Sequence, residues 1–147
     1  MELAGDQEKR PSNVRRLQPL RVLLAGRDRR FLRVTSFLLS RRGYEVRRST
    51  LADAPATSER ERADVVLLDL DGSRVDAARI VAALQASAGM PALLLLTAGT
   101  GDDGWKGLSA LAKWTPIEVL AAEIERAALH RPRPAVPVVA EGDQTSL

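Results

Sequence analysis

The feature that most constrains the fold of this chain is a regular alternation between short apolar runs and segments with helical periodicity. The pattern predicts buried strands at 21–26 and 63–69, a further strand at 91–97, a short strand at 44–46 and a poor, short strand at 108–113. Helices are predicted from 28 to Gly43, over 51–62, from 77 to near Gly89 and over 116–128. The glycine-rich stretch 99–107 can form only a short helix or a loop. The pattern predicts an α/β fold of five βα units, a doubly wound parallel sheet with helices on both faces.

The first predicted helix has the clearest start and end signals. Asp28 is a suitable N-cap residue, and Gly43 can end the helix in a left-handed conformation. The apolar residues Phe31, Val34 and Leu38 follow helical spacing and predict its buried face.

The chain of 147 residues is long enough for one domain with tails. We expect a folded domain over 20–130, preceded by a flexible tail over 1–19. A flexible, proline-containing tail is expected over 131–147, because its prolines cannot continue a helix.

Composition excludes several classes of site. The sequence has no cysteine and one histidine, so disulfides, thiolate metal sites and His-dependent triads are not expected. The longest apolar run, 92–96, is too short to span a bilayer, and the first residues lack the apolar region of a signal peptide. We expect a cytoplasmic protein without membrane insertion.

Charge is distributed unevenly along the chain. Residues 1–62 carry a net charge of +7 and residues 63–147 a net charge of −4, because the arginines are concentrated near the first helix and second strand. Such a face could meet an acidic partner or a phosphate backbone. Aromatic residues are few among the arginines, so a solvated helix face is favoured and nucleic-acid binding is not expected.

Four polar residues fall at or just after predicted strand ends: Asp28, Asp69, Thr97 and Lys113. In open parallel sheets the functional site lies at the carboxyl ends of the strands. Asp69 follows an apolar strand and therefore needs solvent or a cation, for which Lys113 is the natural partner. Thr97 either belongs to this site or satisfies the backbone of a loop.

Four segments in this order and spacing resemble the CheY-like receiver domain of bacterial two-component response regulators: LRVLLAGRD, ADVVLLDLD, PALLLLTAG and LAKWTPIEVLAAEI. The resemblance covers about residues 20–130 and implies a flavodoxin-like sheet with strand order 2-1-3-4-5. It implies that Asp69 is the phosphoacceptor and that Thr97 and Lys113 bind the phosphoryl group. In the family, Mg²⁺ is held by the phosphoacceptor and an acidic pair after the first strand.

The sequence departs from the family at that pair. Gly26 and Arg27 stand in the two positions, and Asp28, one position later, is the first acidic residue. We favour Asp28 as a helix cap. Arg27 could direct its guanidinium at Asp69 and neutralise it permanently. Trp114 follows Lys113 where the family commonly has proline.

These departures predict an atypical receiver-like signalling module, not an enzyme, that acts by protein–protein interaction without Mg²⁺-dependent phosphorylation. The expected partner is a histidine kinase or an output protein, or a second copy in a homodimer, and no cofactor is expected. One alternative is a conventional single-domain response regulator, phosphorylated on Asp69, with Mg²⁺ held by Asp28 and Asp69. A second is a small nucleotide-binding protein or enzyme, for which Gly99–Lys106 offers only an incomplete phosphate loop.

Overall fold

The computed structural model describes residues 18–70, 74–97 and 108–131. They contain a five-stranded, all-parallel sheet in the order β2-β1-β3-β4-β5, which confirms the expected fold and strand order. The strands are β1 (Arg21–Ala25), β2 (Glu45–Ser49), β3 (Val65–Asp69), β4 (Ala92–Thr97) and β5 (Ser109–Ala112). The helices are α3 (Arg29–Arg41), α4 (Ala54–Glu61), α5 (Arg74–Gln85) and α6 (Ile117–Leu129).

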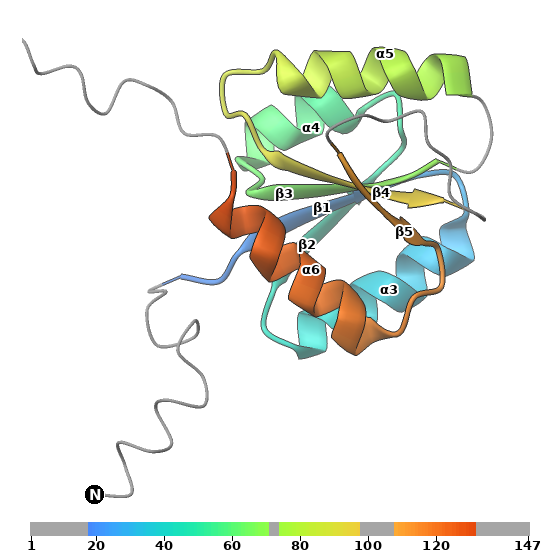
Figure 1. Cartoon of the computed structure of the whole chain (residues 1–147), viewed down its shortest axis with the longest axis vertical. Coiled ribbons are helices and arrows are strands. Elements are labelled where there is room, and N and C mark those ends of the chain that lie inside the picture. Colours follow the sequence, from blue (N-terminus) through green and yellow to red (C-terminus); the bar gives the residue numbers. More distant parts are fainter. Residues whose placement is uncertain (1–17, 71–73, 98–107, 132–147) are drawn as a thin grey trace, which may run out of the picture.

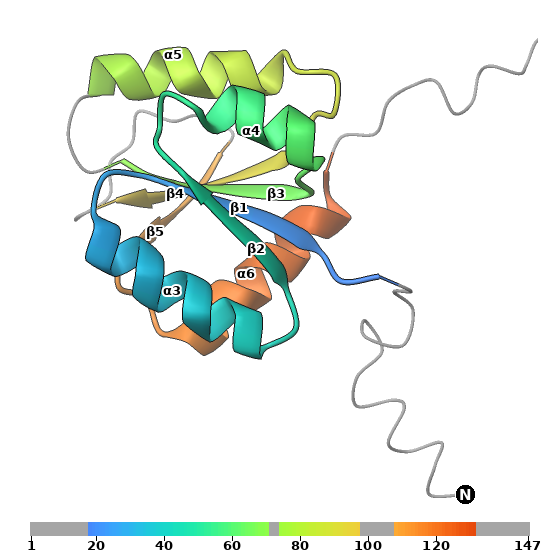
Figure 2. The same ribbon diagram turned by 180° about the vertical axis from the view of Figure 1, so that it is seen from behind.

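The helices cover the sheet in two layers. Helices α4 and α5 lie on one face, and α3 and α6 lie on the other (Figures 1 and 2). Alternate residues of each strand point to opposite faces, so Val22 and Leu24 pack with α3 and α6, whereas Leu23 and Ala25 pack with α4 and α5. The central strands β3 and β4 are almost fully buried on both faces, as their continuous apolar sequences predict.

Helix α3 begins as expected, but its buried face differs from the prediction. The Asp28 side chain caps the helix by accepting a hydrogen bond from the Phe31 N–H (3.1 Å), and Gly43 follows with φ of +99°. The buried residues are Phe31, Leu32, Thr35 and Leu39. The prediction was therefore wrong for Val34 and Leu38, which are 37% and 38% exposed.

Two strands have bounds that differ from the apolar pattern. The N–H of Tyr44 donates to the Leu39 carbonyl (3.3 Å), so Tyr44 belongs to the turn after α3 and β2 begins one residue later. Strand β2 then continues to Ser49 through two arginines, because it lies at the edge of the sheet, where charged side chains reach water. Strand β5 ends at Ala112, so Lys113 follows it directly.

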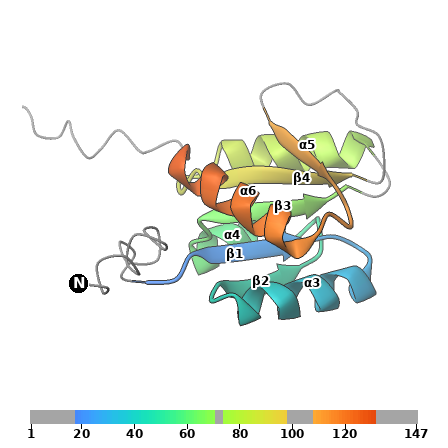
Figure 3. The same ribbon diagram turned by 60° about the horizontal axis from the view of Figure 1, so that its bottom comes forward.

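The carboxyl ends of the strands lie together at one end of the sheet (Figure 3). At the opposite end, Arg131 joins Asp64 (Nη1–Oδ1, 2.7 Å), and Asp64 also accepts a hydrogen bond from the backbone N–H of Arg21 (2.8 Å). Within the described ranges, no helix is long and apolar enough to cross a membrane.

Some predicted features lie outside the described residues. These are the segment between β4 and β5, with Trp105 and the incomplete phosphate loop, and nearly all of both predicted tails.

Candidate functional site

Asp69 is the last residue of β3 and lies at the centre of the carboxyl end of the sheet. Its strand is flanked by β1 and β4, and the next residue, Leu70, continues the pairing by donating its N–H to the Leu96 carbonyl (2.9 Å). The Asp69 side chain has no exposed surface. A carboxylate buried to this degree requires a compensating cation or hydrogen bonds.

Lys113 supplies the cation. Its Nζ lies 3.2 Å from Asp69 Oδ2 and 2.9 Å from Asp28 Oδ2, and its side chain is only 10% exposed. The lysine is positioned by the sheet, because its backbone N–H donates to the Thr97 carbonyl at the end of β4 (2.8 Å). One ammonium group therefore bridges two carboxylates, one at the start of α3 and one at the end of β3.

Asp28 is held from both of its oxygens. Oδ1 accepts the capping hydrogen bond from the Phe31 N–H, and Oδ2 accepts one from Lys113 Nζ. The hydrogen bond from Lys113, supported by that from the Phe31 backbone, lowers the pKa of Asp28 below its usual value of 3.8. Asp28 therefore has two roles at once: it caps α3, and it belongs to the site through its bond with Lys113.

Gly26 lies against the Asp69 side chain. A Cβ atom at position 26 would lie 2.6 Å from Cβ of Asp69 and 3.2 Å from its Oδ2. Position 26 is thus occupied by a residue without a side chain, and the Asp69 side chain fills the space that a side chain there would need.

Two aromatic rings pack beside the bridge, and sequence reasoning did not assign them to the site. Lys113 Nζ lies 5.2 Å from the centre of the buried Phe31 ring, a distance typical of a cation–π contact. Trp114 meets the same ring edge to face, with centroids 4.8 Å apart, and is itself 60% exposed. The sequence predicts Phe31 only as a core residue. Helical spacing indicates that a residue is buried, but it does not indicate that a charged group such as Lys113 lies against its ring.

Arg27 does not lie where the sequence analysis placed it. Its side chain is exposed and forms no ion pair with Asp69 in the described part of the chain, and it lines a groove between α3 and β2. The fixed cation beside Asp69 is Lys113, because β5 brings it directly to the end of β3. Thr97 lies at the end of β4, with its backbone bonded to Lys113 and its side chain half-buried.

The residues present do not fit a Mg²⁺ site. Mg²⁺ needs several oxygen ligands in near-octahedral positions. Both Asp28 oxygens already accept hydrogen bonds, Lys113 occupies the space between the two carboxylates, and Gly26 and Arg27 provide no acidic oxygen. Among the described residues there is no group of three or more His, Cys, Asp or Glu side chains that could hold a metal.

Solved structures of receiver proteins have the same fold. The chain matches the chemotaxis response regulator CheY4 of Vibrio cholerae with a TM-score of 0.66 and 22% identity, over 75% of this chain and 99% of that one. It matches a CheY-like receiver domain protein from Methanospirillum hungatei with a TM-score of 0.66 and 17% identity, over 77% and 96% of the two chains. A receiver domain protein from Bacillus halodurans matches with a TM-score of 0.56 and 25% identity, over 79% and 100%. No protein-family model matches the sequence, and no curated protein matches it.

Proposed function

We propose that this chain is an atypical receiver-like signalling module of a two-component or phosphorelay system, which acts by protein–protein contact and without Mg²⁺-dependent phosphorylation. The observation that carries this proposal is the bridge in which Lys113 joins Asp28 and Asp69 over a fully buried Asp69 carboxylate. The shared fold of the solved receiver structures supports the class of protein.

The bridge removes what phosphoryl transfer needs. The attacking carboxylate must reach phosphorus, and the charge of the transferring group must be neutralised by cations. Here the Asp69 oxygens are buried and the nearby ammonium is already shared with a second carboxylate. The negative charge of Asp69 is thus already balanced by Lys113 of the same chain, whereas in phosphoryl transfer a metal ion and a phosphoryl group would change the charge at this place.

Exposed apolar side chains on α3 and just after β5 support action by contact. Val34, Phe37 and Leu38 are partly or largely exposed on α3, and Val34 is one turn from Phe31, on which Trp114 packs. Aromatic and aliphatic groups clustered on a surface are typical anchors of protein interfaces. We infer that a histidine kinase or an output protein docks on this face, which is defined by Val34, Phe37, Leu38 and Trp114.

The test is incubation with acetyl phosphate and Mg²⁺, followed by intact-mass measurement, with a conventional receiver as positive control. We expect no gain of a phosphoryl group, and no change in Tm when beryllofluoride and Mg²⁺ are added together. A stoichiometric phosphoryl adduct that is lost in Asp69→Asn would overturn the proposal and favour the conventional response regulator.

A further inference from the structure

A basic groove lies between α3 and the edge strand β2, apart from the bridge. It has a volume of about 850 Å³ and is lined by five arginines from the turn after β1, from α3 and from β2. These are Arg27, Arg29, Arg33, Arg47 and Arg48. Leu32 and Val46 give the groove an apolar floor, and none of the described residues that line it is acidic.

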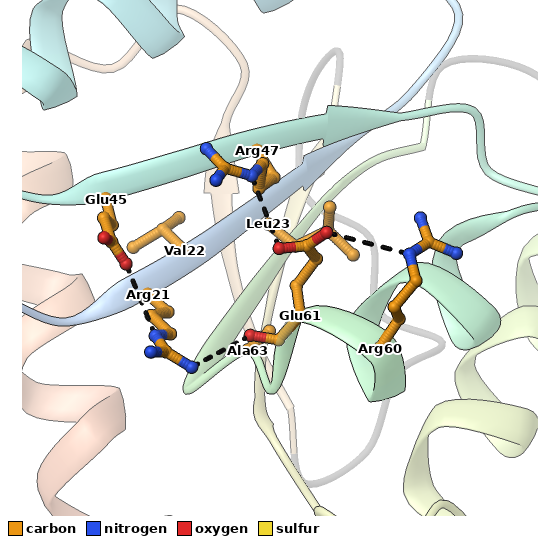
Figure 4. Close-up of a pocket in the computed structure, with 8 residues that line it drawn as sticks. All are labelled: Arg21, Val22, Leu23, Glu45, Arg47, Arg60, Glu61 and Ala63. Atoms are coloured by element: carbon orange, nitrogen blue, oxygen red, sulfur yellow. Dashed lines mark hydrogen bonds and ion pairs between the residues drawn. The ribbon is translucent and has the colours of Figure 1, made fainter.

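Arg47 lines both this groove and the pocket on the other side of β2, and the other four arginines of the groove differ from the arginines of that pocket. There, Arg21 pairs with Glu45 (3.3 Å), and Arg47 and Arg60 both reach Glu61 (3.4 and 3.7 Å), as Figure 4 shows. In the groove, Arg27, Arg29, Arg33 and Arg48 form no ion pair with any described residue, and only Arg47 has an acidic partner. Positive charge is therefore neutralised on one side of the strand and concentrated on the other.

Strand β2 also presents an unpaired backbone edge. It pairs with β1 on one side only, and no other strand of the described residues lies beside it. Charged residues on an edge strand can serve simply to prevent aggregation. That role needs charges on the strand alone, whereas here Arg29 and Arg33 of α3 converge on the same hollow.

We propose that this groove and edge bind an extended acidic segment of a partner protein, which adds to the sheet as a strand beside β2. The backbone of the segment would pair with β2, and alternate carboxylates would face the arginines, with which they can form bidentate pairs. The five residues of β2 set the length of the paired segment at about five residues, or ~17 Å at roughly 3.3 Å per residue. A nucleic acid is less suited, because it cannot use a strand edge and the groove-lining residues include no aromatic ring for stacking.

The probe is a fluorescein-labelled six-residue peptide in which glutamate alternates with valine, measured by fluorescence anisotropy at low and moderate salt. A second peptide has the same sequence but is N-methylated at every residue, which keeps its charge and blocks strand pairing along both of its edges. A third probe is an oligothymidylate of similar net charge. The chain variants are Arg33→Glu/Arg48→Glu and, as matched control on α3 outside the groove, Arg30→Glu.

We expect saturable binding of the first peptide that weakens with salt. The double variant should lose at least tenfold in affinity, and Arg30→Glu less than threefold. N-methylation should also cost at least tenfold, because it removes the backbone pairs.

Three results would overturn the proposal. Equal binding of the N-methylated peptide would reduce the groove to a non-specific charged surface. Tighter binding of the oligothymidylate would assign it to nucleic acid. Absence of binding to every probe at low salt would leave the arginines as protection of the strand edge. None of these outcomes depends on whether Asp69 is phosphorylated, so the test is independent of the function proposed above.

Discussion

At the scale of single residues, the site is organised by how closely four residues approach one another. Gly26 leaves room for the Asp69 side chain, Lys113 balances it, and Asp28 shares the same ammonium. A buried ion pair is weak evidence of net stability, but removing one partner of such a pair is costly. The ion pairs of Lys113 therefore hold the side chains of Asp28 and Asp69 in place more than they stabilise the folded protein.

Gly26→Ala should destabilise the protein by about 1–3 kcal/mol, the usual cost of forcing extra volume into a packed interior. The added Cβ would meet Cβ of Asp69, which cannot rotate away. In an Asp69→Gly background the same substitution should cost less than about 0.5 kcal/mol, because the opposing atom is gone. Urea unfolding of the four proteins measures this coupling.

Gly89→Ala is the control for that cycle. Nothing lies within 4 Å of a Cβ at position 89. This substitution should be neutral or slightly stabilising, by up to about 1 kcal/mol. Additive costs at positions 26 and 69 would show that the close approach does not hold in solution.

Asp28 should contribute a pH-dependent part of the stability. Since its pKa is lowered in the folded state, its contribution is complete above the unfolded value near 4 and is lost as pH falls through the folded value. Asp28→Asn keeps a capping oxygen but removes the charge. The stability difference between wild type and Asp28→Asn should therefore be largest at pH 7 and shrink as pH falls below about 4.

This comparison is made by urea unfolding at a series of pH values. Asp53→Asn is the control, since Asp53 precedes α4 without a side-chain capping bond. A difference for Asp28→Asn that stays constant from pH 7 to pH 3 would contradict the role of Lys113 at this residue.

At the scale of the elements, much of the fold could be predicted from the apolar runs. The strands could be predicted because β1, β3 and β4 are buried on both faces and are apolar except at one end. Thr97 ends β4, and Lys113 follows β5. We expected the two residues to lie together because neighbouring parallel strands end at one edge of the sheet. The edge strand β2 was less well predicted, since its arginines do not report the backbone pairing with β1.

The face of α3 shows why side-chain detail was harder to predict. The sequence supports two stripes that both begin at Phe31, one through Val34 and Leu38 and one through Thr35 and Leu39. Hydrophobicity favours the first, but packing on the sheet buries the second. Likewise, spacing alone could not show that a lysine would bridge two carboxylates, because that depends on shifts of about one ångström.

The two neighbouring leucines of α3 provide a direct test. Leu39→Ala should cost about 2–5 kcal/mol, as for other fully buried leucines. Leu38→Ala removes the same atoms from a partly exposed position and should cost less than about 1 kcal/mol. Chemical unfolding of both variants measures the difference, and equal costs would favour the face that the sequence predicted.

At the scale of the whole molecule, the two ends of the sheet carry different sets of polar contacts. The carboxyl end carries the bridge between Lys113, Asp28 and Asp69. The amino end is closed by Arg131, whose guanidinium reaches Asp64, the Gly89 carbonyl (3.0 Å) and the Met90 carbonyl (3.3 Å). This one side chain joins the end of α6 to the start of β3 and to the turn before β4.

Arg131→Ala should lower stability by about 1–3 kcal/mol, because it removes several charge-assisted hydrogen bonds at once. Arg131→Lys should recover only part of this loss, since an ammonium lacks the planar fork that reaches three acceptors. Arg126→Ala is the matched control, because Arg126 forms only an exposed pair with Glu123 and should cost less than about 0.5 kcal/mol. Thermal or urea unfolding that ranks Arg126→Ala equal to Arg131→Ala would show that the amino-end contacts carry no stability.

The contact between Gly26 and Asp69 has a consequence for how such a chain could evolve. A single substitution that places any side chain at position 26 would bring its Cβ against Cβ of Asp69 and would be selected against for stability. A smaller residue at position 69 would relieve this contact, but it would also remove the carboxylate that Lys113 balances. On this backbone the two positions therefore cannot vary independently, and glycine at position 26 is retained for as long as aspartate occupies position 69.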